Sequence, residues 1–475
     1  MPSKIIPPNK YELQCLVIRT INKNGRDCDL NFIDVSNVTD MSYLFMNIPF
    51  EGDISQWNVS KVTNMRGMFW QSDFNADISN WDVSHVTDMK DMFLYSSFNG
   101  DISNWDVSKV SNMRGMFWNC AFNGNISCWD VSNVNDMGYM FFQSRFCGDI
   151  SRWDVSKVND MSHMFENSAF NDDLSRWNVS SVKKMSEMFA GSPFNGDISN
   201  WDVSHVTDMS GMFSDTPFNT NISNWDVSNV QNMYAMFCGA QFNGDISNWN
   251  VSRVTNMSRM FYKSKFDGDL SQWNVAGVTN MFEMFCGSCF DGDLSKWNVS
   301  HVTDMSKMFK NSKYNGSISQ WNVGNVSSMA EMFCDSCFDG DLSKWNVSHV
   351  TDMSKMFKNS KYNGDISQWN VGNVSSMAEM FCDSCFDGDL SAWDVSHVTD
   401  MDGMFRNSKF NGDISRWNVE NVSSMVEMFC DSCFDGDLSK WNIDSLEYNI
   451  DMFKNSKFTG DISHWEVLNE YDCDC

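Results

Sequence analysis

Apolar residues recur in a fixed order along this chain, once every 24 residues. In the repeat that covers residues 194–213, FNGDISNWDVSHVTDMSGMF, the apolar positions are Phe194, Ile198, Trp201, Val203, Val206, Met209, Met212 and Phe213. A period of about 20 to 50 residues is typical of repeat architectures, in which each unit buries its apolar face only by stacking on its neighbours. We therefore expect one domain of stacked repeats.

Within each repeat the spacing of apolar residues changes from that of a strand to that of a helix. Ile198, Trp201 and Val203 have the spacing that places Trp and Val on one face of a short strand. The apolar residues of 206–213 follow at i, i+3, i+6 and i+7, which is typical of a short helix, with Ser204 as its N-cap. The sequence thus predicts an α/β solenoid, a leucine-rich-repeat-like parallel stack of about 19 coils of 24 residues, each a short strand plus a short helix.

The two ends depart from the repeat. Residues 9–24, NKYELQCLVIRTINKN, predict an amphipathic helix that covers the first coil, and the last units lose the apolar pattern. Terminal units with a polar outer side are what a soluble repeat array needs. We expect an N-terminal helical cap over 1–28, the repeat array over 29–468 and an acidic, cysteine-containing tail over 469–475.

The units DVSHVTDMSGMF and FNGDISNWDV, with the entry segment DLNFIDVSNVTDMSYLF, resemble the DUF285 or BspA-like leucine-rich-repeat family, the bacterial surface protein repeat of about 26 residues. The resemblance covers roughly residues 29–468. It implies a solenoid fold and a surface or adhesion-type repeat protein, and therefore a location at the cell surface.

The net charge and the absence of long apolar runs limit the classes of partner and the locations that we expect for this protein. The formal charge of −28 and the pI near 4.4 argue against binding to nucleic acid or to anionic membranes, and favour a basic partner. The chain shows no signal peptide, wall anchor or membrane-spanning run, so we expect no membrane insertion. That absence favours the cytoplasm, including the cytoplasm of a host cell, or a virion, against the surface location that the resemblance implies.

The residue after each repeat tryptophan is almost always Asp or Asn, and on the predicted strand it points away from the core. Carboxylates about 4.8 Å apart repel by roughly 1 kcal/mol even in water, so a run of them predicts bound cations, basic partners or raised pKa values. Stacked Asn amides instead predict a hydrogen-bonded ladder. The alternative is that each side chain only closes a local turn. The ligand-facing candidates are Asp82, Asp106, Asp130, Asp154, Asp202 and Asp226, followed by Asn250, Asn274, Asn298, Asn322, Asn346 and Asn370.

A second acidic set is the Asp of the Gly-Asp-Ile-Ser motif. It includes Asp53, Asp77, Asp101, Asp149, Asp173, Asp197 and Asp245. An Asx-type turn is the favoured interpretation because a turn glycine precedes it, and weak calcium binding is the alternative.

Four CxxC pairs occur at intervals of 48 residues: Cys286/Cys289, Cys334/Cys337, Cys382/Cys385 and Cys430/Cys433. Such pairs can indicate zinc or redox chemistry. Lysine or arginine takes both positions in the intervening repeats, however, which indicates an exposed connector with free or locally oxidised surface thiols. Five histidines share one repeat position and predict a solvated face: His85, His205, His301, His349 and His397.

Residues 290–337 and 338–385 are identical except for Ser317 against Asp365. Near-identical repeats do not bring unlike groups to one point, and no catalytic motif occurs, so we expect no enzyme, no catalytic residues, no cofactor and no dedicated metal site. The favoured hypothesis is a non-catalytic, adhesin- or scaffold-like repeat protein that presents an extended surface to a protein or other macromolecule. The alternatives are a cation-binding or metal-sequestering repeat protein and a purely structural spacer.

Overall fold

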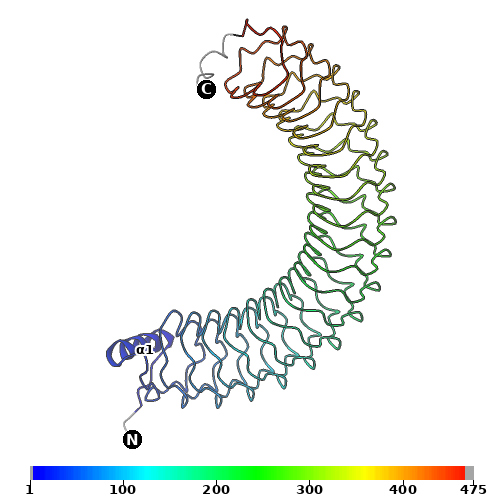
Figure 1. The fold of residues 1–475 in the computed structure, drawn as a ribbon. Coiled ribbons are helices and arrows are strands. Elements are labelled where there is room, and N and C mark those ends of the chain that lie inside the picture. The colour runs from blue at the N-terminus through cyan, green and yellow to red at the C-terminus, as the bar shows by residue number, and fades with distance from the viewer. Residues whose placement is uncertain (1–3, 466–475) are drawn as a thin grey trace. The chain divides into compact units, whose positions relative to one another are not determined.

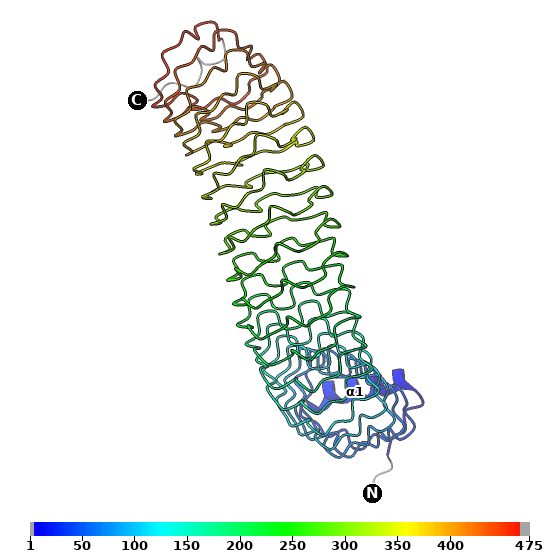
Figure 2. The same ribbon diagram turned by 90° about the vertical axis from the view of Figure 1, so that its right-hand side faces the viewer.

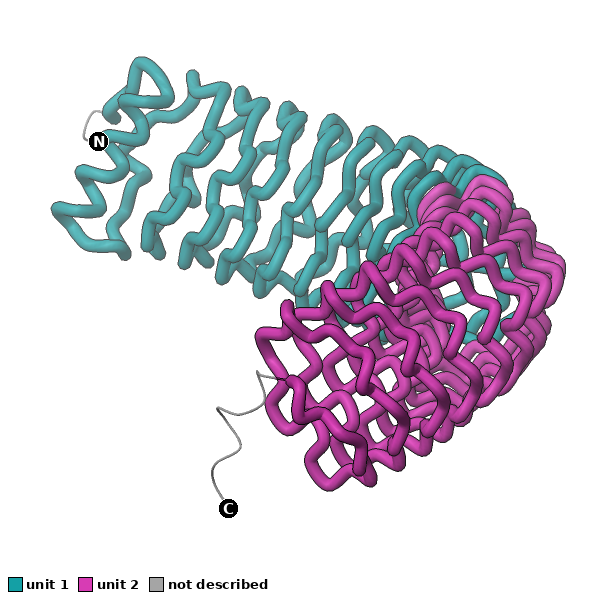
Figure 3. Tube along the Cα trace, turned by 90° about the horizontal axis from the view of Figure 1, so that it is seen from above, with its two compact units in different colours: residues 1–230, 240–244 teal, residues 231–239, 245–475 magenta. Residues whose placement is uncertain are grey.

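The computed structural model describes residues 4–465. The chain divides into two compact units (Figure 3). Unit 1 comprises residues 1–230 and 240–244, and unit 2 comprises residues 231–239 and 245–475. Within each unit, successive 24-residue repeats lie side by side, as Figures 1 and 2 show from two directions. The predicted tail at 469–475 lies outside the described residues.

The helix expected over 9–24 is present as α1, Lys10–Asn24, in unit 1. Asn9 caps its first turn by accepting a hydrogen bond from the backbone N–H of Glu12 at 2.9 Å. Gly25, with φ of +98°, ends the helix and donates its N–H to the carbonyl of Ile21. Local capping signals in the sequence therefore determine both ends of α1.

One face of α1 packs against the first repeat of unit 1. Leu13, Val17 and Ile21 are buried on that face. The Lys10 ammonium lies 3.3 Å from Asp40, and the Gln14 amide donates to the backbone carbonyl of Tyr43. The helix thus covers the outer side of the first repeat.

The repeats themselves contradict the predicted α/β solenoid. Among residues 4–465, α1 is the helix that occurs, and no repeat contains a named strand or a helix. Each repeat is a succession of turns. Neighbouring repeats join through isolated parallel bridges, such as Asp136 to Asp160 in unit 1 and Ser328 to Asp352 in unit 2. One strand plus one helix per coil is therefore wrong for this chain.

The helix prediction fails because the backbone hydrogen bonds run to the next repeat and not along the chain. In residues 137–143, the N–H groups of Met137, Tyr139, Phe141 and Gln143 donate to carbonyls of the following repeat at 2.8–3.0 Å. Tyr139 and Gln143 adopt left-handed φ values of +59° and +52°. A right-handed helix excludes such residues, so the segment turns back at each of them.

The strand prediction fails for a related reason. The Trp129 N–H bonds to the carbonyl of Ile126, and the Val134 N–H bonds to that of Val131, so both segments close into four-residue β-turns. Apolar residues three apart then point to the same side without a helix or a strand. The turn spacing accounts for the apolar pattern equally well.

The predicted core positions are nevertheless buried in every complete repeat. All eight apolar residues of 194–213 are at most 3% exposed. Equivalent rings stack from one repeat to the next. The centroids of Trp57 and Trp81 lie 6.5 Å apart, and those of Phe117 and Phe141 lie 5.7 Å apart. The core is thus a set of aromatic and methionine columns that continue through each unit.

The repeat tryptophan also makes a polar link between repeats. In unit 1 the indole Nε1–H of Trp129 donates to the backbone carbonyl of Ile102 in the preceding repeat at 3.1 Å. In unit 2 that of Trp321 donates to Leu294 at 3.0 Å. A buried indole N–H needs a partner, and a turn carbonyl of the preceding repeat supplies it while also accepting the backbone N–H that closes its own turn.

A second polar link comes from the residue that follows the first phenylalanine of each repeat. The side chain of Asn75 accepts the backbone N–H of Asn99, and Asn99 accepts that of Asn123, both at 2.8 Å. In unit 2 Asp291 accepts the N–H of Asn315 at 3.0 Å. These side chains tie each repeat to the next along the edge of the unit.

Two repeats of unit 2 carry a tyrosine where the others have the first phenylalanine. Tyr314 and Tyr362 are fully buried, and their hydroxyl groups find no hydrogen-bond partner among the described residues. An unsatisfied buried hydroxyl costs about 1–3 kcal/mol. The substitutions Tyr314→Phe and Tyr362→Phe should each stabilise unit 2 by about 1 kcal/mol, seen as a higher midpoint in urea unfolding. Phe338→Tyr is the matched control and should lower it. A lower midpoint for both Tyr→Phe variants would show that the hydroxyls are satisfied.

Candidate functional site

The residue after the repeat tryptophan lies at the surface, as expected. Asp82, Asp106, Asp130 and Asp154 are exposed and come from four consecutive repeats of unit 1. We call these four, with Asp202 and Asp226, the acidic column. In each, Oδ1 accepts the backbone N–H of the serine two residues on, at 3.0–3.1 Å. Each carboxylate therefore closes an Asx turn and still faces solvent.

Four members of the acidic column, Asp82, Asp106, Asp154 and Asp202, have lowered pKa values where carboxylate repulsion predicts raised ones. Hydrogen bonds from the following serine hold the pKa of Asp82, Asp106 and Asp154 below the ordinary value. For Asp82, the repulsion by Asp106 is the smallest of the five influences. Short hydrogen bonds to the charged form outweigh repulsion between carboxylates one repeat apart in water.

The asparagines at the same position in unit 2 also close Asx turns. Asn250, Asn298 and Asn346 accept the N–H two residues on at 3.1–3.2 Å, and Asn274, Asn322 and Asn370 do the same. Among the described residues, their amides form no ladder with one another. The predicted ladder of Asn amides is therefore wrong for these residues. The side chains that link one repeat to the next belong instead to the residue after the first phenylalanine, such as Asn75.

The aspartates of Gly-Asp-Ile-Ser confirm the Asx-turn interpretation. Asp77 and Asp149 accept the N–H of Ser79 and Ser151 at 2.9 Å. These hydrogen bonds lower the pKa of Asp77 and Asp149. The motif thus shapes the turn that contains each buried isoleucine or leucine.

The CxxC pairs are only partly at the surface. The first cysteine of each pair is buried: Cys286, Cys334, Cys382 and Cys430. Burial raises the pKa of Cys334 to about 12 and that of Cys286 to about 11. The second cysteine is exposed in Cys289 and Cys337 and half-buried in Cys385 and Cys433, and all eight thiols are free. The prediction of an exposed connector is therefore wrong for the first position of each pair.

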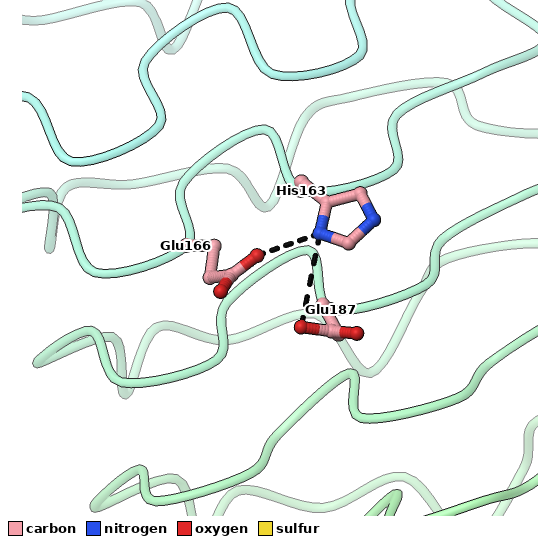
Figure 4. A group of neighbouring side chains, drawn as sticks. All are labelled: His163, Glu166 and Glu187. Atoms are coloured by element: carbon pink, nitrogen blue, oxygen red, sulfur yellow. Dashed lines mark hydrogen bonds and ion pairs between the residues drawn. The ribbon is translucent and has the colours of Figure 1, made fainter. Parts of the chain in front are cut away.

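The five histidines that share one repeat position are all exposed, as expected for a solvated face. His163 differs from them because it occupies the left-handed position of its repeat, with φ of +60°. Its Nδ1 lies 2.6 Å from Glu166 Oε2 and 3.8 Å from Glu187 Oε2 (Figure 4). Sequence reasoning missed this cluster because the three residues belong to two repeats whose turns it took for helices.

An aromatic and arginine cluster adjoins His163 in unit 1. The ring of Tyr139 stacks on His163 with centroids 4.2 Å apart and on Trp118 at 4.9 Å. The Arg114 guanidinium lies 4.7 Å from the centroid of Tyr139 and also reaches Asp136 at 3.5 Å. These side chains project from successive Met-x-x-Met-Phe turns.

The same turns in unit 2 carry a ladder of ion pairs. Arg259 contacts Glu283 at 2.6 Å, Lys307 and Lys310 contact Glu331, and Lys355 and Lys358 contact Glu379. Arg406 bridges Glu379 and Glu427. Base and acid thus alternate along the repeats of this unit.

Comparison with models of known protein families identifies the family of this repeat. The family model described as "Mycoplasma protein of unknown function, DUF285" matches five times, over residues 19–121, 94–195, 190–291, 286–387 and 382–474. The chain belongs to the DUF285 family. The expected family membership is thus confirmed, and the DUF285 repeats are tandem over nearly the whole length. No curated protein matches the chain.

The DUF285 description assigns no activity. The single helix α1 has 15 residues, and no helix within residues 4–465 has the length and apolarity that a membrane crossing requires.

The burial of the CxxC pairs predicts a difference in thiol reactivity. In the native protein at pH 8, iodoacetamide should modify Cys289 and Cys337 within minutes and leave Cys286 and Cys334 unmodified, because the thiolate is the nucleophile and burial disfavours it. Peptide mass spectrometry gives the extent of modification at each site. Equal labelling of both members of a pair would contradict the buried position, and denatured protein, in which all should react, is the control.

Proposed function

We propose that this protein is a non-catalytic, scaffold-like repeat protein that recognises a basic protein partner through the acidic column of unit 1. The observation that carries the proposal is the column itself, which presents exposed carboxylates in register from consecutive repeats. Recognition by carboxylates at a regular spacing requires lysine or arginine on the partner.

The Asx turns make these carboxylates suited to binding. Each turn uses Oδ1, and the side chain stays exposed. The turn already fixes the side chain, so little side-chain entropy remains to be lost on binding. The lowered pKa of Asp82, Asp106, Asp154 and Asp202 keeps them charged at neutral pH.

The charge of the whole chain supports a basic partner. The formal charge is −28, which attracts cationic surfaces over a distance of about 8 Å at physiological ionic strength. Lys109 and Lys157 lie three residues after Asp106 and Asp154, yet each is the weakest of the influences on its aspartate. The column therefore stays anionic despite these neighbours.

The repetition of the chain supports a non-catalytic role. The same Asx geometry recurs at every repeat and places like groups in register. An active site needs different groups that converge on one reacting atom. A column of like groups is better suited to an extended contact.

The central test replaces the four consecutive aspartates together: Asp82→Asn, Asp106→Asn, Asp130→Asn and Asp154→Asn. The turns should survive, because Asn178 and Asn250 close the same turn in the natural sequence. Binding of a fluorescent Lys/Arg-rich peptide, measured by anisotropy, should weaken about tenfold or more, since an exposed ion pair contributes about 0.2–1 kcal/mol. Affinity capture from cell extracts, with the natural protein and the fourfold variant as baits, then identifies the partner whose binding depends on the acidic column.

The matched control carries the same change of net charge elsewhere in unit 1: Asp77→Asn, Asp101→Asn, Asp149→Asn and Asp173→Asn. Asn125 and Asn221 naturally occupy that position and close its turn. This variant should bind the peptide nearly as well as the natural protein. If both variants bound the peptide equally weakly, the effect would come from net charge and not from the acidic column. If neither variant lost affinity, the result would favour a structural spacer.

A further inference from the structure

The cluster of His163, Glu166 and Glu187 contains two carboxylates and one imidazole in a partly sheltered place. The side chains of His163 and Glu166 are 19% and 13% exposed, and that of Glu187 is 41% exposed. One potential ligand atom from each residue lies within 4.8 Å of those of the other two. Figure 4 shows the three side chains converging on a common point between two repeats.

Unit 2 shows how this chain treats a glutamate at the position of Glu187. Glu283, Glu331, Glu379 and Glu427 occupy the same left-handed position, with φ between +53° and +57°. Each of them forms an ion pair with lysine or arginine from a neighbouring repeat. A fixed side-chain cation thus accompanies every one of these glutamates.

No lysine or arginine among the described residues plays that role for Glu187 or Glu166. The following repeat has Gly211 at the left-handed position, and Glu166 takes the place of the cation that Lys310 supplies to Glu331 in unit 2. Arg114, on the other side of Tyr139, is held by Asp136 and Asp160. Two carboxylates therefore share a single imidazole, and the cluster lacks the cation that its counterparts have.

We propose that His163, Glu166 and Glu187 bind a divalent first-row transition-metal ion, through Nδ1 of the histidine and one oxygen of each carboxylate, with water completing the coordination. Imidazole with carboxylates suits Mn²⁺, Fe²⁺ or Zn²⁺ better than Ca²⁺ or Mg²⁺, which prefer oxygen alone. Ligand atoms about 2.1 Å from such an ion lie about 3.4 Å apart in a tetrahedron, and the present separations from Nδ1, 2.6 and 3.8 Å, lie on either side of this value.

The surroundings are consistent with a bound cation. Tyr139 stacks on one face of the His163 ring, and Phe142 meets the ring at 65° with its centroid 6.5 Å away, so the imidazole plane is held by packing. Metal ligands bind in their deprotonated forms, so Nδ1 of His163 would carry no proton while it holds the ion.

The test uses Mn²⁺ alone as the probe, with the full chain. The chain has 16 cysteines, and Mn²⁺ avoids thiolates, which would capture Zn²⁺. Loss of the free-ion signal in electron paramagnetic resonance counts bound Mn²⁺. We expect one ion to bind more tightly than the rest, and its affinity to fall at least tenfold in His163→Gln and in Glu187→Gln. Circular dichroism checks that both variants fold.

The matched control is Glu331→Gln, which removes a carboxylate from the same repeat position where lysines already balance it. It should leave the tight ion unaffected. The proposal is overturned if the natural protein binds no ion more tightly than the His163→Gln and Glu187→Gln variants do, or if Glu331→Gln weakens binding as much as they do. A bound ion should also raise the thermal unfolding midpoint of the natural protein and not that of Glu187→Gln.

Discussion

The structure depends on hydrogen bonds that pass from one repeat to the next. Turns leave many backbone groups unpaired within a repeat, and a buried unpaired group costs about 1–3 kcal/mol. The neighbouring repeat satisfies them. The N–H of Tyr139 donates to the carbonyl of Ser162, and the buried indole N–H of Trp129 likewise finds its acceptor in the preceding repeat, at the carbonyl of Ile102. A single repeat thus has neither a core nor a satisfied backbone by itself, which explains why the 24-residue period is kept so strictly.

The same constraint separates the residues that build the repeat from those that are free to vary. Trp, Val, Met and Phe fill the core, while Asp, Asn and Ser close turns at fixed positions. The left-handed positions tolerate Tyr, His, Glu, Lys, Arg or Gly, because a turn and not a helix surrounds them. Differences between the units therefore concentrate there: aromatic residues and His163 in unit 1, and an ion-pair ladder in unit 2.

The sequence was sufficient to predict which residues are buried, the helix at 10–24 and the Asx turns of Gly-Asp-Ile-Ser. It was not sufficient for the conformation of the repeat. Val206, Met209 and Met212 follow one another at intervals of three residues, and that spacing suits a helix and a series of β-turns alike. The difference lies in left-handed residues such as Tyr139 and Glu187, which are not glycines and carry no clear signal.

The candidate sites show the same division. The acidic column could be located from the period alone, since the residue after a buried tryptophan must face outwards. The lowered pKa of its carboxylates could not be predicted, because the serine hydrogen bonds that lower the pKa of Asp82 depend on the turn geometry. The cluster at His163 could not be located either. It requires knowledge that residues 163 and 187, one repeat apart, have side chains on the same side of the unit.

Hydrogen exchange at the tryptophan indoles tests the central role of the inter-repeat bonds most directly. With ¹⁵N-labelled tryptophan, nuclear magnetic resonance resolves the indole N–H signals of the 20 tryptophans. The account predicts slow exchange for repeat tryptophans such as Trp129 and Trp321, whose N–H is bonded to the preceding repeat, and faster exchange for Trp70, which lies outside the core columns and is half-exposed. Fast exchange at Trp129 and Trp321, equal to that of Trp70, would contradict it.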